Sequence, residues 1–291
     1  MTQPPQRTAN PAKIFLLPNL MTAGNLIFGF LAVLKIFEGA MLRETERETG
    51  GSNWTHYYFV SIYCILAACV FDLLDGRLAR LGGKESPFGR EFDSLADIVS
   101  FGVAPALLVF KIVLYEIPHQ IGWLIAGFYL LCGALRLARF NVAATYNLGT
   151  GTRNFTGFPI PAAAGLISSI TLLIISNYQN EAELAAGYGG IGLAALTVFL
   201  AFMMFSKFEY PSFKGFNWRT QFSLPKFLGM VALLGLTIIY YWWMPAVMFV
   251  SYLLYGFLRP FISRAWRREI EEEEDDEVPA HTRSSHPPED V

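Results

Sequence analysis

The sequence predicts an all-α protein, a polytopic membrane helix bundle of about eight transmembrane helices with both termini in the cytoplasm. Of its 291 residues, 53% are hydrophobic and only 16% are charged, whereas soluble domains carry about 25% charged residues. The apolar residues are gathered in segments of roughly 20, the length that an α-helix needs to cross a bilayer. The basic residues are gathered in the connections on one side of these segments, which predicts their orientation.

Eight segments meet this length criterion. The first is the most unusual, because it contains Pro18, Asn19, Thr22 and Asn25, and we expect its start to lie along the membrane interface. In chain order, the predicted spans are 14–37, 57–80, 92–115, 120–142, 161–177, 188–205, 225–242 and 244–263.

The charge of the connections predicts which side each span faces. Most Lys and Arg residues precede the first span, follow the second, fourth and sixth spans, or follow the last. The alternate connections contain only Arg43 and Arg47. Because cytoplasmic loops are enriched in Lys and Arg, eight spans with two cytoplasmic termini fit the pattern.

Three regions are expected along the chain. Residues 1–13 form a cytoplasmic segment, residues 14–265 form the transmembrane domain, and residues 266–291 form an acidic cytoplasmic tail. The tail is rich in charge, Pro, Ser and His without apolar periodicity, which predicts disorder. A basic stripe with interleaved aromatic residues is absent from the sequence, so no nucleic-acid partner is expected.

Four aspartates are the main candidates for chemistry. Asp72 and Asp75 are three residues apart at the end of the second span, and Asp93 and Asp97 are four apart at the start of the third. These spacings place each pair on one helix face. The short connection 81–91 makes the two helices antiparallel neighbours, so the two faces can meet.

Four converging carboxylates repel one another unless cations neutralise them. Oxygen ligands favour hard divalent ions, which predicts Mg²⁺ or Mn²⁺ rather than zinc. Gly76 lets a bulky ligand approach the backbone, and Arg80 adds a bidentate donor for phosphate. The alternative is that the aspartates only cap helices or are solvated at an interface. That alternative explains poorly why four of them are in phase on adjacent helices.

These residues form a longer pattern that resembles the signature of the CDP-alcohol phosphotransferases: Asp72-x₂-Asp75-Gly76-x₂-Ala79-Arg80-x₈-Gly89-x₃-Asp93-x₃-Asp97. Enzymes of this family are embedded in membranes and move a phosphatidyl or related group from a CDP-linked donor to an alcohol. The resemblance implies two divalent cations on the four aspartates, with Asp97 also acting as general base. It further implies contacts with the nucleotide and its diphosphate from Gly76, Arg80, Ser86, Thr22 and Asn25.

Two further stretches predict the acceptor alcohol. Leu-Arg-Leu-Ala-Arg-Phe-Asn at 135–141 and Phe-Thr-Gly-Phe-Pro-Ile-Pro-Ala-Ala at 155–163 resemble the serine O-phosphatidyltransferase branch of the family. The resemblance implies CDP-diacylglycerol and L-serine as substrates. A serine carboxylate needs a cationic partner near the membrane, so Arg136 and Arg139, together with Asn141, are candidate acceptor-binding residues. Anchoring at the cytoplasmic membrane surface is the alternative role of the two arginines.

Other acceptors and one other class of protein remain open at this point. Glycerol 3-phosphate, an inositol phosphate or choline could replace serine in the same chemistry. A cation-coupled transporter is a distant alternative, because the aspartates are predicted at the cytoplasmic boundary rather than at the bilayer midplane where transporter sites lie. The resemblance also implies a bacterial plasma membrane, an active site on its cytoplasmic side, contact with membrane lipids, and the homodimer that is typical of the family.

Overall fold

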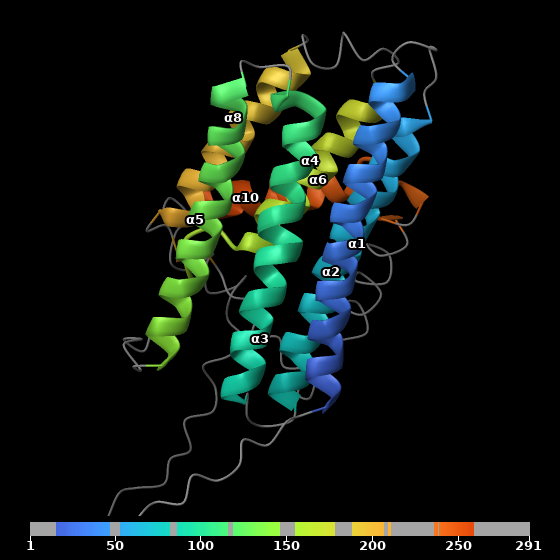
Figure 1. Cartoon of the computed structure of the whole chain (residues 1–291). Coiled ribbons are helices and arrows are strands. Elements are labelled where there is room, and N and C mark those ends of the chain that lie inside the picture. Colours follow the sequence, from blue (N-terminus) through green and yellow to red (C-terminus); the bar gives the residue numbers. More distant parts are fainter. Residues whose placement is uncertain are drawn as a thin grey trace, which may run out of the picture.

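A computed structural model of the chain describes residues 16–46, 53–81, 86–115, 119–145, 155–177, 188–206, 209–210, 236–237 and 239–258. The predicted helical architecture is confirmed within these residues (Figure 1). The helices are α1 (Leu16–Glu46), α2 (Trp54–Leu81), α3 (Pro87–Asp97), α4 (Ala104–Val109), α5 (His119–Thr145), α6 (Ile160–Asn177), α8 (Tyr188–Phe205) and α10 (Met244–Leu258). Two π-helical segments, η1 (Ile98–Val103) and η2 (Phe110–Leu114), join α3 and α4 into one rod.

Five of these helices are long and apolar enough to cross a membrane: Leu17–Glu46, Trp54–Gly76, Pro87–Leu114, Gln120–Ala143 and Ile160–Asn177. Two shorter apolar helices, Gly189–Phe205 and Met244–Leu258, follow them. The predicted span 225–242 lies largely outside the described residues, as do the segments 1–13 and 266–291. The described part therefore supports an integral membrane protein with five candidate spans, and the count of eight stays a prediction.

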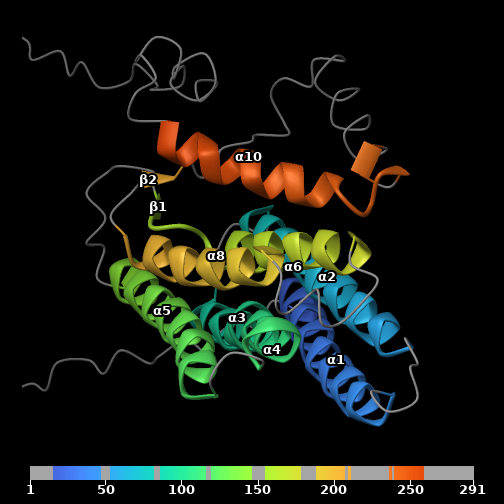
Figure 2. The same cartoon turned by 90° about the horizontal axis from the view of Figure 1, so that it is seen from above.

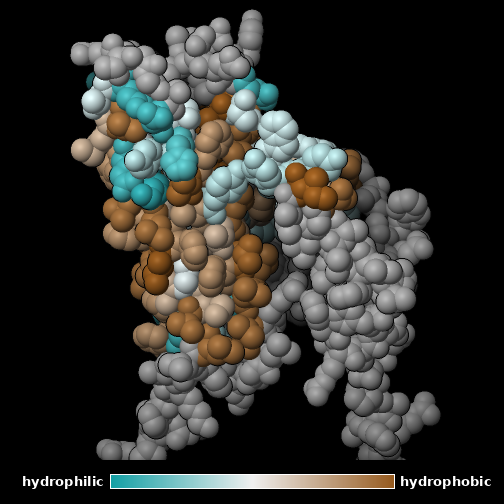
Figure 3. Space-filling view, turned by 90° about the vertical axis from the view of Figure 1, so that its right-hand side faces the viewer, coloured by the Kyte–Doolittle hydropathy of each residue, from teal (hydrophilic) through white to brown (hydrophobic). Residues whose placement is uncertain are grey.

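The apolar surface on the sides of the bundle agrees with an integral membrane protein. Figure 3 shows an apolar surface on the side where α1 and α2 lie, with hydrophilic residues gathered at one end. Large apolar side chains of α1 are half exposed there, including Ile27, Phe30 and Phe37. A soluble protein rarely exposes such a continuous apolar surface, whereas a lipid bilayer covers it.

The largest differences from the predicted boundaries occur in two helices. The first helix continues past residue 37 to Glu46, and the third begins at Pro87 rather than at 92. Hydropathy locates where a helix leaves the apolar layer, whereas capping decides where it ends. Ser86 caps α3 by accepting a hydrogen bond from the backbone N–H of Gly89 at 2.9 Å, and Pro87 occupies the first turn, where proline is favoured.

The α3–η2 rod occupies the centre of the described bundle. In its most apolar window 67% of the residues are buried, against 28% in the windows of α1 and α5. Seen from above, α1 and α2 lie on one side of the rod and α5 on the other, while α6 and α8 separate it from α10 (Figure 2). The start of the rod, α3, contacts α1 and α5, while α6 and α8 contact its later part.

The first π-helical segment begins directly after Asp97. The phenolic hydroxyl of Tyr129 on α5 donates to the carbonyl of Phe101 at 3.0 Å, and Ser100 donates to the carbonyl of Asn25 on α1 at 2.9 Å. A Cβ at Gly29 would collide with Ser100, so the two backbones pack closely at this point. The segment η1 is thus bonded to helices on two sides, and π-helical turns are frequent near functional sites.

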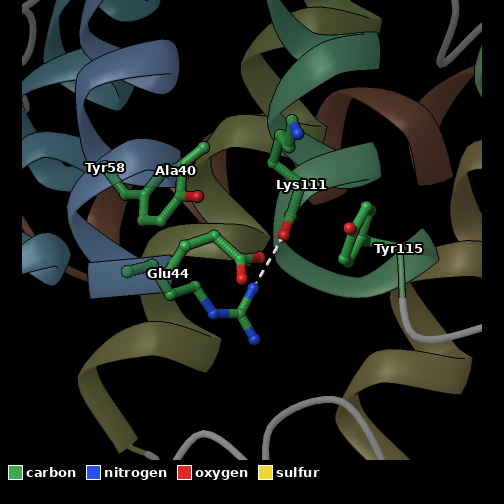
Figure 4. Close-up of a pocket in the computed structure, with 6 residues that line it drawn as sticks. Ala40, Glu44, Tyr58, Lys111 and Tyr115 are labelled. Atoms are coloured by element: carbon green, nitrogen blue, oxygen red, sulfur yellow. Dashed lines mark hydrogen bonds between the residues drawn. The ribbon is translucent and has the colours of Figure 1, made fainter. Parts of the chain in front are cut away.

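At the opposite end of α1, one arginine joins it to η2. Arg43 donates from Nη1 to the carbonyl of Lys111 at 2.8 Å (Figure 4). Its guanidinium also lies 5.3 Å from the ring centroid of Trp54. The small pocket at this place is lined by Ala40, Arg43, Glu44, Tyr58, Lys111 and Tyr115. About 30 Å of helix separates Arg43 from Thr22, so this contact belongs to the far end of the bundle.

Candidate metal centre

Three of the four aspartates meet where α2 ends and α3 begins. Asp72, Asp75 and Asp93 each offer one carboxylate oxygen, and these oxygens lie within 4.8 Å of one another. Asp75 is only 5% exposed. Carboxylate oxygens are the ligands that Mg²⁺ and Mn²⁺ prefer, so the residues present fit a hard divalent cation. The predicted meeting of the two helix faces is confirmed for these three residues.

Asp97 lies one turn further into the rod. It is 6% exposed and lies within electrostatic range of Asp72, Asp93 and Asp75. Its Oδ1 accepts a hydrogen bond from Nδ2 of Asn25 at 3.0 Å. The three-oxygen group does not include Asp97, so the fourth aspartate lies outside this close group, and it is about as buried as Asp75.

The first helix contributes two hydrogen bonds to this centre. The hydroxyl of Thr22 lies 2.9 Å from Oδ2 of Asp75 and 3.2 Å from the carbonyl of Pro18, and Asn25 binds Asp97 as described above. The sequence directed attention to these residues only as nucleotide contacts. Their spacing of three residues, which puts both on one helix face, was the signal that they face the same polar site.

The surroundings of Gly76 and Ser86 differ. Among the described residues, no heavy atom lies within 4 Å of a Cβ built at Gly76, so these residues leave the space beside the aspartates open at this point. Ser86 is buried, and its oxygen accepts the helix-capping bond from Gly89. Arg80 belongs to α2, but its side chain lies outside the part of the chain that is described.

The predicted acceptor residues of α5 lie in three different settings. Arg136 is 9% exposed and lies within electrostatic range of Asp97 and Asp72; among the described residues, its Nε has no hydrogen-bond partner. Arg139 is exposed, with its guanidinium 6.0 Å from the ring centroid of Phe205. Asn141 donates to Oγ of Ser94 at 2.9 Å and so joins α5 to α3.

The stretch 155–163, which follows α5 in the chain, begins with a segment that folds against the end of α8. Strand β1 (Phe155–Thr156) pairs antiparallel with β2 (Glu209–Tyr210), and the N–H of Phe158 donates to the carbonyl of Met203 at 3.0 Å. Gly157 has a φ of +88°, and a Cβ there would lie 3.3 Å from Nη2 of Arg139. The chain between β1 and α6 therefore passes beside the Arg139 guanidinium.

Comparison with known proteins identifies similar sequences. A family model described as CDP-alcohol phosphatidyltransferase matches residues 15–207, which include all four aspartates and the predicted acceptor residues of α5. The CDP-diacylglycerol–serine O-phosphatidyltransferase of Helicobacter pylori is 32% identical over 246 residues, 84% of this chain and 91% of the relative. The protein of the same name from Bacillus subtilis is 34% identical over 198 residues, 68% of this chain and 91% of the relative. Archaetidylserine synthase of Methanothermobacter thermautotrophicus is 34% identical over 208 residues, 70% of this chain and 73% of the relative.

Proposed function

The chain belongs to the CDP-alcohol phosphatidyltransferase family, and we propose that it transfers the phosphatidyl group of CDP-diacylglycerol to L-serine, giving phosphatidylserine and CMP. The observation that carries this proposal is the agreement among relatives matched over most of their length, whose names specify serine as the acceptor. That agreement favours serine over glycerol 3-phosphate, an inositol phosphate or choline. The cluster of Asp72, Asp75 and Asp93 supports the reaction class.

In this proposal the protein lies in a bacterial plasma membrane, surrounded by its lipids. The five candidate spans and the charge of the connections support this location. Residues 14–265 form the transmembrane domain, with 1–13 and 266–291 as cytoplasmic segments and the active site at the cytoplasmic side. The homodimer expected for the family is part of the same proposal.

The aspartates Asp72, Asp75, Asp93 and Asp97 would hold two divalent cations, Mg²⁺ or Mn²⁺. When bound, such ions neutralise negative charge on the diphosphate and on the leaving phosphate. The open space beside Gly76 supports approach of a diphosphate to the backbone of α2. Arg80 and Ser86 are the further residues that we assign to the nucleotide and its diphosphate, on the basis of the family signature.

Asp97 is the proposed general base. Its carboxylate takes the proton of the serine hydroxyl, and the serine oxygen attacks the phosphorus that bears diacylglycerol. The bond between this phosphorus and the oxygen of CMP breaks, and CMP leaves with the electron pair. The buried position of Asp97 supports the assignment, because it keeps water away from the base while the acceptor binds.

Arg136 is the proposed partner of the serine carboxylate. A buried cation is stable only when it is well paired, and the Nε of Arg136 has no hydrogen-bond partner among the described residues. Arg136 lies within electrostatic range of Asp97, the proposed base. An acceptor that carries both a hydroxyl and a carboxylate needs a cation near the base, so that its carboxylate is bound while its hydroxyl is deprotonated. Arg139 and Asn141 complete the proposed acceptor site.

The test is CMP release by the purified full-length protein with CDP-diacylglycerol and Mn²⁺ or Mg²⁺. We expect release that requires L-serine and that stops when the metal is chelated. Release that ignores serine but responds to glycerol 3-phosphate, an inositol phosphate or choline would keep the reaction and overturn the acceptor. No release with any alcohol, together with cation flux into liposomes, would favour a transporter.

A further inference from the structure

Two polar side chains of α1 face the aspartates from inside the bundle. Thr22 is 3% exposed and Asn25 is 0% exposed. A polar group at such depth requires a hydrogen-bond partner. Here the nearest partners are carboxylates of two other helices, Asp75 on α2 for Thr22 and Asp97 on α3 for Asn25, and the Thr22 hydroxyl also lies 3.2 Å from the carbonyl of Pro18. One face of α1 therefore connects to both halves of the aspartate cluster.

Each of these bonds selects one oxygen of a carboxylate. Thr22 lies 2.9 Å from Oδ2 of Asp75, and Asn25 donates to Oδ1 of Asp97 at 3.0 Å. Hydrogen bonds to a charged acceptor are the stronger kind, so they restrict rotation of the two carboxylates. The second oxygen of each carboxylate then has a defined direction.

The helix that holds Asn25 is itself fixed to the rod that holds Asp97. Ser100 lies three residues after Asp97 and donates to the backbone carbonyl of Asn25 at 2.9 Å. Gly29, one turn after Asn25, lets Ser100 approach, because any Cβ there would collide with it. The donor and the acceptor of the Asn25–Asp97 bond are thus mounted on two backbones that are locked together.

We propose that Thr22 and Asn25 are positioning residues that hold Asp75 and Asp97 in the orientation needed by the divalent cations and by the serine hydroxyl. They act through the aspartates, because the hydroxyl of Thr22 and the Nδ2 of Asn25 are bonded to carboxylates within the chain, whereas Oδ1 of Asn25 has no hydrogen-bond partner among the described residues. The inference rests on the proposed function for the identity of the reaction, but the hydrogen bonds themselves do not depend on it. Residues of this kind, one step removed from a metal, commonly change metal affinity by about 10- to 100-fold.

The decisive comparison uses two substitutions at one position. Thr22→Val keeps the shape of the side chain and removes the hydroxyl, whereas Thr22→Ser keeps the hydroxyl. In the full-length protein without substrates, we expect Thr22→Val to weaken Mn²⁺ binding, measured by electron paramagnetic resonance, by about tenfold or more. Thr22→Ser should restore most of the wild-type affinity.

A second comparison separates positioning from nucleotide binding. At saturating Mn²⁺, Asn25→Leu should lower kcat by about tenfold or more and change the KM for CDP-diacylglycerol by less than about threefold. Unchanged Mn²⁺ affinity in Thr22→Val would overturn the proposal, and so would an increased KM for CDP-diacylglycerol with an unchanged kcat in Asn25→Leu. If Asn25→Leu does not fold in detergent, the Thr22 pair alone decides. If the wild type binds Mn²⁺ but does not use serine, the proposed function fails, while the Mn²⁺ measurement still tests the positioning role.

Discussion

The carboxylate of Asp97 is bonded to Asn25 on one side and lies within range of three other carboxylates and of the Arg136 guanidinium. Few buried groups in the described bundle lie within electrostatic range of so many charged side chains. A side chain in this setting is sensitive to a change of one atom, and for this reason it offers the sharpest tests at the scale of single residues.

Asp97→Asn replaces one carboxylate oxygen by an amide nitrogen and removes the ability to take a proton. Because a positioned general base contributes about 10²- to 10⁴-fold, we expect turnover to fall by at least about 10²-fold. CMP affinity at saturating Mn²⁺ should change by only a few-fold, as measured by calorimetry. Glu38→Gln, an exposed carboxylate paired with Lys35 near the other end of α1, is the control. Full turnover in Asp97→Asn would remove Asp97 from the role of base.

Arg136→Met removes a buried cation and keeps much of its length. A hydrogen bond to a charged group is worth about 1.5–3 kcal/mol, so the KM for serine should rise by about 10- to 100-fold while that for CDP-diacylglycerol changes little. Initial rates at varied serine concentration measure this. Arg139→Met, on the exposed side of the same helix, should have a smaller effect. An unchanged KM for serine in Arg136→Met would contradict the carboxylate assignment.

At the scale of helices and strands, hydropathy and spacing predicted which segments are helical and which aspartates meet. They did not predict where α1 ends or where α3 begins, since the start of α3 depends on the cap at Ser86. Hydropathy and spacing also did not predict the hydrogen bonds from α1 to the aspartates. Such bonds depend on how two helices are rotated against each other, which is set by the contact between Gly29 and Ser100.

Gly157 is the best place to test the short β-pair. Its φ of +88° disfavours any residue with a side chain, and a Cβ would also collide with the carbonyl of Met204. We expect Gly157→Ala to lower the free energy of unfolding by about 1–3 kcal/mol, seen as a lower midpoint of thermal denaturation in detergent. Gly192→Ala is the matched control, since a Cβ there meets no heavy atom of the described residues within 4 Å. Equal midpoints for the two variants would show that the turn tolerates strain.

At the scale of the whole molecule, the aspartate cluster and the Arg43 contact lie at opposite ends of the bundle. The carboxylates gather where α2 ends and α3 begins, whereas Arg43 joins α1 to η2 at the far end. The composition alone predicted the membrane setting, because the charged residues are too few for a soluble domain. The eight-span topology needs the residues between α8 and α10, most of which lie outside the described part.

Metal removal tests the molecule as a unit. Chelation should abolish CMP release, and Mg²⁺ or Mn²⁺ should restore it, because an all-carboxylate set favours hard cations. The measurement is the rate of CMP release before chelation, after it and after each metal is added back. Restoration by Zn²⁺ alone would contradict the predicted donor set.

The π-helical turn after Asp97 has a consequence for how this rod can change in evolution. A π-turn holds more residues than an α-turn, so η1 stores an additional residue between the aspartates and the buried half of the rod. Loss of one residue there would let the rod return to regular α-helix. Because five α-helical residues turn the chain about as far as six π-helical residues, Asp93 and Asp97 would keep nearly the same direction relative to the buried half. An alignment gap of a single residue within 98–103 would thus mark a relative whose rod is regular α-helix and whose aspartates keep their direction.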